Sequence, residues 1–140
     1  MKLRVRSVFA IVAGFVVTAV GSTATDAIMH ATGIFPGSPR DMSAPLFVLA
    51  TAYRAVFTVA GGFVTARAAP DRPMRHAWIL AGIGLVAGVA GVVFYFLGGK
   101  SQLGPAWYPV SIAVEAIPCV WLGARLAGVS QPITDSNAST

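Results

Sequence analysis

The chain contains 140 residues, of which 56% are hydrophobic and 11% are charged. Soluble domains carry about 25% charged residues, so this composition excludes an ordinary water-soluble globular protein. The formal net charge of +5 comes mostly from Lys and Arg at the ends of hydrophobic segments, which argues against nucleic-acid binding. The single cysteine, Cys119, excludes a disulfide within the chain and a CxxC metal or redox site.

Four hydrophobic segments follow one another and predict helices at residues 7–30, 45–67, 76–97 and 107–127. Each has roughly the 20 residues that cross a ~30 Å hydrocarbon core. Helices are required there because lipid offers no hydrogen-bond partner to exposed backbone groups. The intervening Gly- and Pro-rich breaks are short, so successive helices should be antiparallel neighbours. We predict an all-α polytopic integral membrane protein, an antiparallel four-helix transmembrane bundle spanning residues 1–129.

Both ends of the chain need separate interpretation. The first segment also resembles a signal peptide, because basic residues precede it and Ser22-Thr23-Ala24 resembles a cleavage site. Its apolar run exceeds the ~7–15 residues of such a signal, which favours a retained helix. Residues 130–140 are polar and lack periodicity, and they predict a disordered C-terminal tail.

The distribution of Lys and Arg predicts how the bundle is oriented, because cytoplasmic loops are enriched in these residues. Arg40 and Lys100 fall on one side of the predicted bundle. The other side holds the larger group: Lys2, Arg4, Arg6, Arg67, Arg72, Arg75 and Arg125. We therefore expect both termini in the cytoplasm, in a multi-pass protein of the plasma (bacterial inner) membrane whose main partner is the lipid bilayer.

Four ionisable residues lie within the hydrophobic segments, where a charge is costly and needs a reason. They are Asp26, His30, Arg54 and Glu115. At ~1.5 Å of rise per residue, Asp26 lies about 8 Å, Arg54 about 14 Å and Glu115 about 10 Å from the outer ends of their helices. Helical periodicity gives each segment one polar face, so these groups should meet in one layer. Two further side chains are expected to reach that layer, Tyr95 and Ser111.

This polar cluster has two interpretations, and the sequence leaves both open. In the first, it is a binding site of a small transporter, channel or solute-binding protein, for a proton, cation or small polar solute. Asp26 and Glu115 would take protons or cations, Arg54 would keep them ionised or hold an anionic group, and His30 would respond to pH. In the second, the protein is a structural or accessory membrane subunit, and the cluster is an ion-pair network that holds the bundle together.

Other site types have weaker support. Asp26 and His30, spaced i to i+4, could bind a divalent metal with Glu115, although Arg54 would repel the cation. The chain lacks HExxH, GxSxG and paired-aspartate motifs, so we expect neither an enzyme nor a bound cofactor. Because four helices enclose little volume, a homodimer is a further expectation. The spacing of Gly84 and Gly88 predicts close helix packing.

Overall fold

The computed structural model describes residues 2–129, and the segment predicted to be a disordered tail lies outside them. Within this range the chain forms four long helices and no strand. The long helices are α1 (Lys2–Ala31), α2 (Ala44–Ala68), α3 (Pro73–Phe94) and α5 (Trp107–Val129). Shorter turns are a 3₁₀ turn, η1 (Pro39–Asp41), a π turn, η2 (Tyr95–Gly99), and α4 (Lys100–Leu103).

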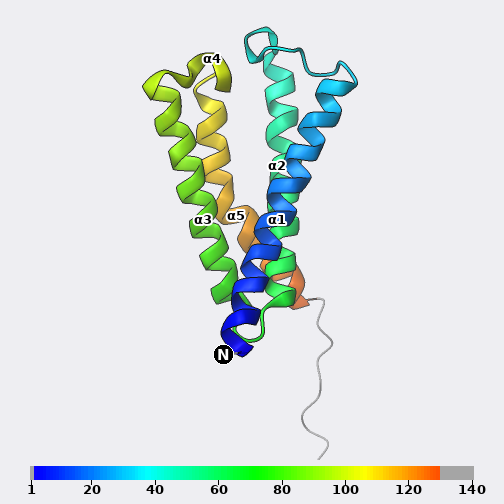
Figure 1. Ribbon diagram of the computed structural model, residues 1–140, viewed down its shortest axis with the longest axis vertical. Coiled ribbons are helices and arrows are strands. Elements are labelled where there is room, and N and C mark those ends of the chain that lie inside the picture. The colour runs from blue at the N-terminus through cyan, green and yellow to red at the C-terminus, as the bar shows by residue number, and fades with distance from the viewer. Residues whose placement is uncertain (1, 130–140) are drawn as a thin grey trace, which may run out of the picture.

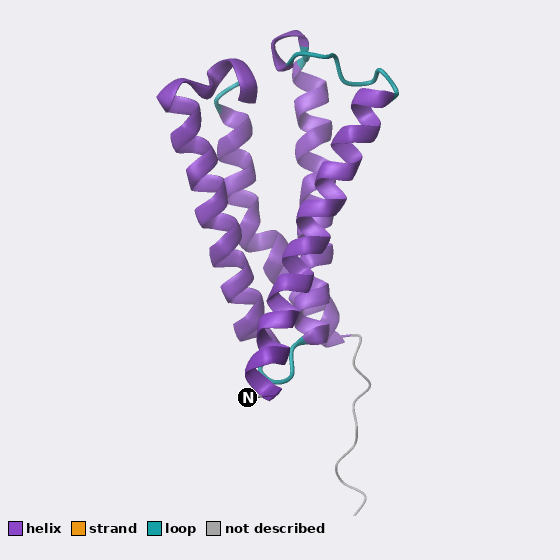
Figure 2. Ribbon diagram, in the orientation of Figure 1, coloured by secondary structure: helices purple, strands orange, loops and turns teal. Residues whose placement is uncertain are grey.

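The long helices form two pairs that diverge along the long axis of the molecule. Figure 1 shows the chain reversing direction at each connection, with α1 beside α2 and α3 beside α5. The pairs are close together at the end that holds the N-terminus and splayed at the other, which we call the closed end and the open end. Packing of α2 on α5 joins the pairs, and α1 and α3 make little contact with each other. The loops lie at the two ends (Figure 2).

Small residues allow the helices to approach closely where they cross. A Cβ atom added to Gly14 of α1 would collide with Gly61 and Thr65 of α2. A Cβ atom on Gly62 would collide with the backbone of Val120 in α5. Such small-residue contacts are typical of helix packing in membranes, where van der Waals contact replaces the hydrophobic effect. They tie α2 to both of its neighbours near the closed end.

Three helix ends lie three or more residues from the expected boundaries, one of them the start of α3, at Pro73 rather than residue 76. The first helix was predicted to begin at residue 7, but α1 begins at Lys2, because Lys and Arg are good helix formers and extend the helix past the apolar run. The third was predicted to end at residue 97 and to be followed by a loop. Instead α3 ends at Phe94 and the chain continues through η2 and α4. Gly98, with φ of 130°, permits this change of direction.

All four long helices are long and apolar enough to cross a membrane. Large apolar side chains cover their outer surfaces, including Val8 at 61% exposure, Val86 at 70% and Val114 at 66%. Water-soluble proteins rarely expose apolar surface on this scale, whereas lipid accepts it readily. The helices are therefore candidate membrane spans, and together they indicate a multi-pass membrane protein.

Candidate functional site

An ion pair between Asp26 and Arg54 links α1 to α2. Nη2 of Arg54 donates to Oδ2 of Asp26, and the hydroxyl of Tyr53 donates to Oδ1 of the same carboxylate. Both oxygens of Asp26 thereby accept a hydrogen bond, one from a charged donor and one from a polar donor. The Arg54 and Asp26 side chains are 28% and 27% exposed, so water shields them only in part.

Tyr53 was not among the residues predicted to form the polar cluster. Its aromatic ring suits an apolar segment, so it draws attention less readily than a charge does. The available signal was its hydroxyl, which needs a partner when it lies away from water. The turn after α1 supports it: Gly33 takes a positive φ of 74°, and the chain folds back so that the amide of Phe35 donates to the carbonyl of Met29 at 2.9 Å. The ring of Phe35 then stacks on that of Tyr53.

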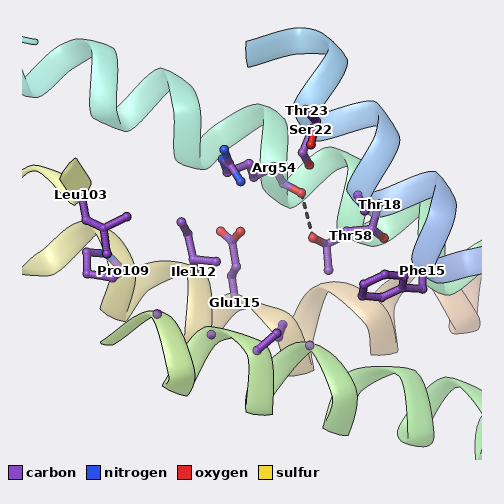
Figure 3. A pocket seen from close by; sticks show the side chains of 16 residues that line it. Phe15, Thr18, Ser22, Thr23, Arg54, Thr58, Leu103, Pro109, Ile112 and Glu115 are labelled. Atoms are coloured by element: carbon purple, nitrogen blue, oxygen red, sulfur yellow. Dashed lines mark hydrogen bonds between the residues drawn. The ribbon is translucent and has the colours of Figure 1, made fainter. Parts of the chain in front are cut away.

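A cavity of about 370 Å³ lies between the two helix pairs (Figure 3). Its charged side chains are Arg54 from α2 and Glu115 from α5. The walls facing them carry hydroxyls, from Thr18, Ser22, Thr23 and Thr58, and glycines and apolar residues of α3 and α5 complete the lining. The cavity thus draws on all four long helices, which is why it forms where the two pairs separate.

Two hydroxyl groups of the lining, those of Thr58 and Thr18, use their hydrogens on backbone carbonyls. Oγ1 of Thr58 donates to the carbonyl of Arg54 at 2.8 Å, and Oγ1 of Thr18 lies 3.1 Å and 3.2 Å from the carbonyls of Gly14 and Phe57. Because each hydroxyl has one hydrogen, these bonds leave the oxygen lone pairs available. These two oxygens therefore suit a cation or a hydrogen-bond donor.

Glu115 is the unpaired charge of the cavity. Figure 3 shows its carboxylate directed from α5 across the cavity toward α2, where Arg54 lies. Within residues 2–129, no hydrogen bond or ion pair holds this carboxylate. Nε of Arg54 is buried and also has no hydrogen-bond partner in that range. Because Asp26 already neutralises Arg54, the three groups together carry an excess of one negative charge when both acids are ionised.

A second, smaller cavity of about 140 Å³ lies nearer the open end. Asp26, His30 and Tyr108 line it, and Arg54 borders both cavities. Asp26 and Glu115 therefore line different cavities that share Arg54. This places the three charged residues in one region of the fold.

The other predicted site residues differ in placement: His30 lines the smaller cavity, whereas Tyr95 and Ser111 lie outside both cavities. His30 is exposed, and its Nδ1 lies 2.8 Å from the backbone carbonyl of Asp26 rather than bonding the carboxylate. Tyr95 lies outside both cavities, with its ring packed against that of Phe96. Ser111 also lies outside them, with its hydroxyl donating to the carbonyl of Tyr108 at 2.8 Å.

The metal interpretation receives no support from this geometry. Nowhere in the described part of the chain do three or more His, Cys, Asp or Glu side chains gather closely enough to hold an ion. Asp26 and Glu115 line different cavities, and the cation Arg54 lines both of them. The proposed trio of Asp26, His30 and Glu115 is therefore not assembled.

The chain matches no protein-family model, no curated protein and no solved structure. Function is therefore inferred from the chemistry and geometry of these residues.

Proposed function

We propose that the protein is a small transporter, channel or solute-binding protein that takes a proton or cation at Glu115, together with a small polar solute. Its helices would span the plasma (bacterial inner) membrane as an antiparallel bundle with both termini in the cytoplasm. The excess of Lys and Arg at the closed end supports this orientation. In it, the open end, where the helix pairs splay apart, faces the extracytoplasmic side.

The proposal depends on one observation: within residues 2–129, the carboxylate of Glu115 has no hydrogen-bond or ion-pair partner. An isolated negative charge in surroundings of low dielectric constant is costly, so it must gain either a proton or a counter-cation. Arg54 does not fill this role, because its charge is already balanced by Asp26. A site that can exchange protons or cations with the open end is what coupled transport and ion binding need.

The cavity also limits the class of solute. Its volume of about 370 Å³ falls near the lower end of the ~300–1,000 Å³ of typical small-molecule sites. Arg54 offers donors to an anionic or carbonyl group, and Glu115 with the hydroxyl oxygens accepts from an ammonium or hydroxyl group. A compact solute with polar groups at both ends fits this lining. The cavity is formed within one chain, so the proposal requires no second copy.

The second candidate function, a structural or accessory subunit, is favoured by the Asp26–Arg54–Tyr53 network. These three side chains connect α1 to α2 and satisfy one another, as an interhelical fastener would. The network explains why Asp26 and Arg54 lie in the bundle. It does not explain Glu115, because a carboxylate that bonds no neighbouring helix does not stabilise the packing of the bundle.

Reconstitution in liposomes tests the proposal with three probes: protons, Na⁺ and K⁺. A trapped pH dye reports proton entry after external acidification, and trapped ion-sensitive dyes report the two cations. We expect uptake by the wild type, no uptake by Glu115→Gln, and wild-type uptake by Asp41→Asn, which removes an exposed acid remote from the cavity. Equal uptake by Glu115→Gln and wild type would overturn the proposal. So would wild-type signals equal to those of empty liposomes for all three probes, which would favour the accessory subunit.

A further inference from the structure

A separate groove lies at the closed end, remote from the two cavities described above. It has a volume of about 410 Å³ and runs between the first turns of α1 and the start of α3. Its rim carries two arginines, Arg4 from α1 and Arg75 from α3. Neither guanidinium has a hydrogen-bond or ion-pair partner among the residues that the structure describes. Two cations facing one groove repel each other unless an anion lies between them.

The other polar residues of the rim fit a phosphate group that carries a single negative charge. Asp71 also lines the groove and offsets one of the two positive charges. Ser7 adds a hydroxyl, and the buried ring of His76 lies on the α3 side. A net charge of about one positive unit matches the single negative charge of a phosphodiester, which arginine binds in bidentate fashion.

The wall of the groove farther from the closed end is apolar. Val8, Ile11 and Ile79 line it, and Val8 and Ile79 are 61% and 43% exposed. Ile11 follows Arg4 by seven positions in the helix, or ~10 Å at ~1.5 Å per residue. A ligand of that length would extend from the polar rim to the start of the hydrocarbon layer. An anion with an attached apolar chain would therefore use the whole groove.

We propose that this groove binds a phospholipid of the cytoplasmic leaflet, with its phosphate between Arg4 and Arg75 and an acyl chain along Val8, Ile11 and Ile79. Basic pockets between helices at the cytoplasmic face are a recurrent form of lipid headgroup recognition. The inference rests on the proposed membrane insertion and orientation, and it is independent of solute binding at Glu115.

The simpler account is that these arginines only set the orientation of the protein, as basic residues at helix ends do. In that case any arginine at the closed end should attract anionic lipid equally. Arg67 provides a matched comparison, because it is exposed at the same end, in the last turn of α2, and outside the groove.

Lipid binding to the purified full chain in detergent, followed by native mass spectrometry, tests the proposal. The probe is phosphatidylglycerol, and the competitors are inorganic phosphate and water-soluble glycerophosphoglycerol. At about 1 kcal/mol per basic residue, Arg4→Gln and Arg75→Gln should each weaken binding about fivefold and together about 25-fold. Arg67→Gln should change it less than twofold. Replacing Val8 with Ser should weaken lipid binding but leave glycerophosphoglycerol binding unchanged.

Three results would overturn the assignment. Equal weakening by Arg67→Gln would show a non-specific basic surface. Displacement of the lipid by equimolar inorganic phosphate would show a free-anion site, and unchanged lipid binding in the double variant would show that the groove is not used. Failure of the membrane proposal is distinguishable, because the protein would then remain dispersed in the absence of detergent or lipid. Failure at Glu115 would appear in the liposome assay and leave these lipid measurements unaffected.

Discussion

Replacing Asp26 with Asn is the most direct test of how the charged residues share their interactions. The substitution keeps the size of the side chain but removes the negative charge that pairs with Arg54. Losing one partner costs about 3–5 kcal/mol for a buried ion pair and about 0–1 kcal/mol for an exposed one. The two side chains are 28% and 27% exposed, so we expect an intermediate loss of about 2 kcal/mol in the free energy of unfolding.

The position of Glu115 makes a second, sharper expectation possible. Its carboxylate faces Arg54 across the cavity, so it can partly neutralise the guanidinium once Asp26 is gone (Figure 3). Glu115→Gln alone should therefore cost less than about 0.5 kcal/mol, while Asp26→Asn with Glu115→Gln should cost more than the sum of the single changes, by about 1 kcal/mol. The reason is that only the double variant leaves Arg54 without any carboxylate.

Reversible unfolding of the four proteins in mixed detergent micelles, monitored by circular dichroism, measures these differences. Wild type, the two single variants and the double variant form one thermodynamic cycle. Strict additivity within about 0.3 kcal/mol would refute the idea that both acids act on one guanidinium. A loss below about 0.5 kcal/mol for Asp26→Asn would show that the ion pair does not hold α1 to α2.

Three further predictions concern packing and topology. Tyr53→Phe removes one of the donors to the ion-paired carboxylate and should lower the free energy of unfolding by about 1 kcal/mol; no change in the same unfolding assay would count against that hydrogen bond. Gly62→Ala places a methyl group against the backbone of α5 and should cost about 1–3 kcal/mol, whereas Gly82→Ala, which meets open space, should be neutral or slightly stabilising. Equal unfolding midpoints for these two variants would disprove the close approach of α2 and α5. For topology, Arg40→Cys in a cysteine-free background should react with an impermeant maleimide added outside intact cells, and Arg72→Cys should react only after permeabilisation. The reverse pattern would invert the proposed orientation.

The charged residues illustrate where sequence reasoning is strong. Depth along a helix follows from counting residues, since each adds a fixed rise, and this count puts Asp26, Arg54 and Glu115 at similar levels. A charged side chain that faces lipid is costly, so each of these residues should face the interior of the bundle. Side chains at similar depth that all face inward then lie in one region of the fold. The four apolar segments can also be identified from the sequence, because the thickness of a bilayer fixes the number of residues required to cross it.

The tertiary structure decided which of these groups are partners. Crossing angles between helix pairs depend on contacts such as Gly62 against Val120, and no periodicity in one helix reports the angle to the next. That divergence opens the cavity and leaves Glu115 unbonded, whereas the packing of α1 on α2 brings Tyr53 to Asp26. Tyr95 lies outside both cavities although its depth predicts the same layer, because depth along a helix does not fix which neighbours a side chain meets. Hydrophobic length and residue depth are local properties of one segment, whereas pairing and cavities arise from how several segments pack, and only the folded arrangement contains that information.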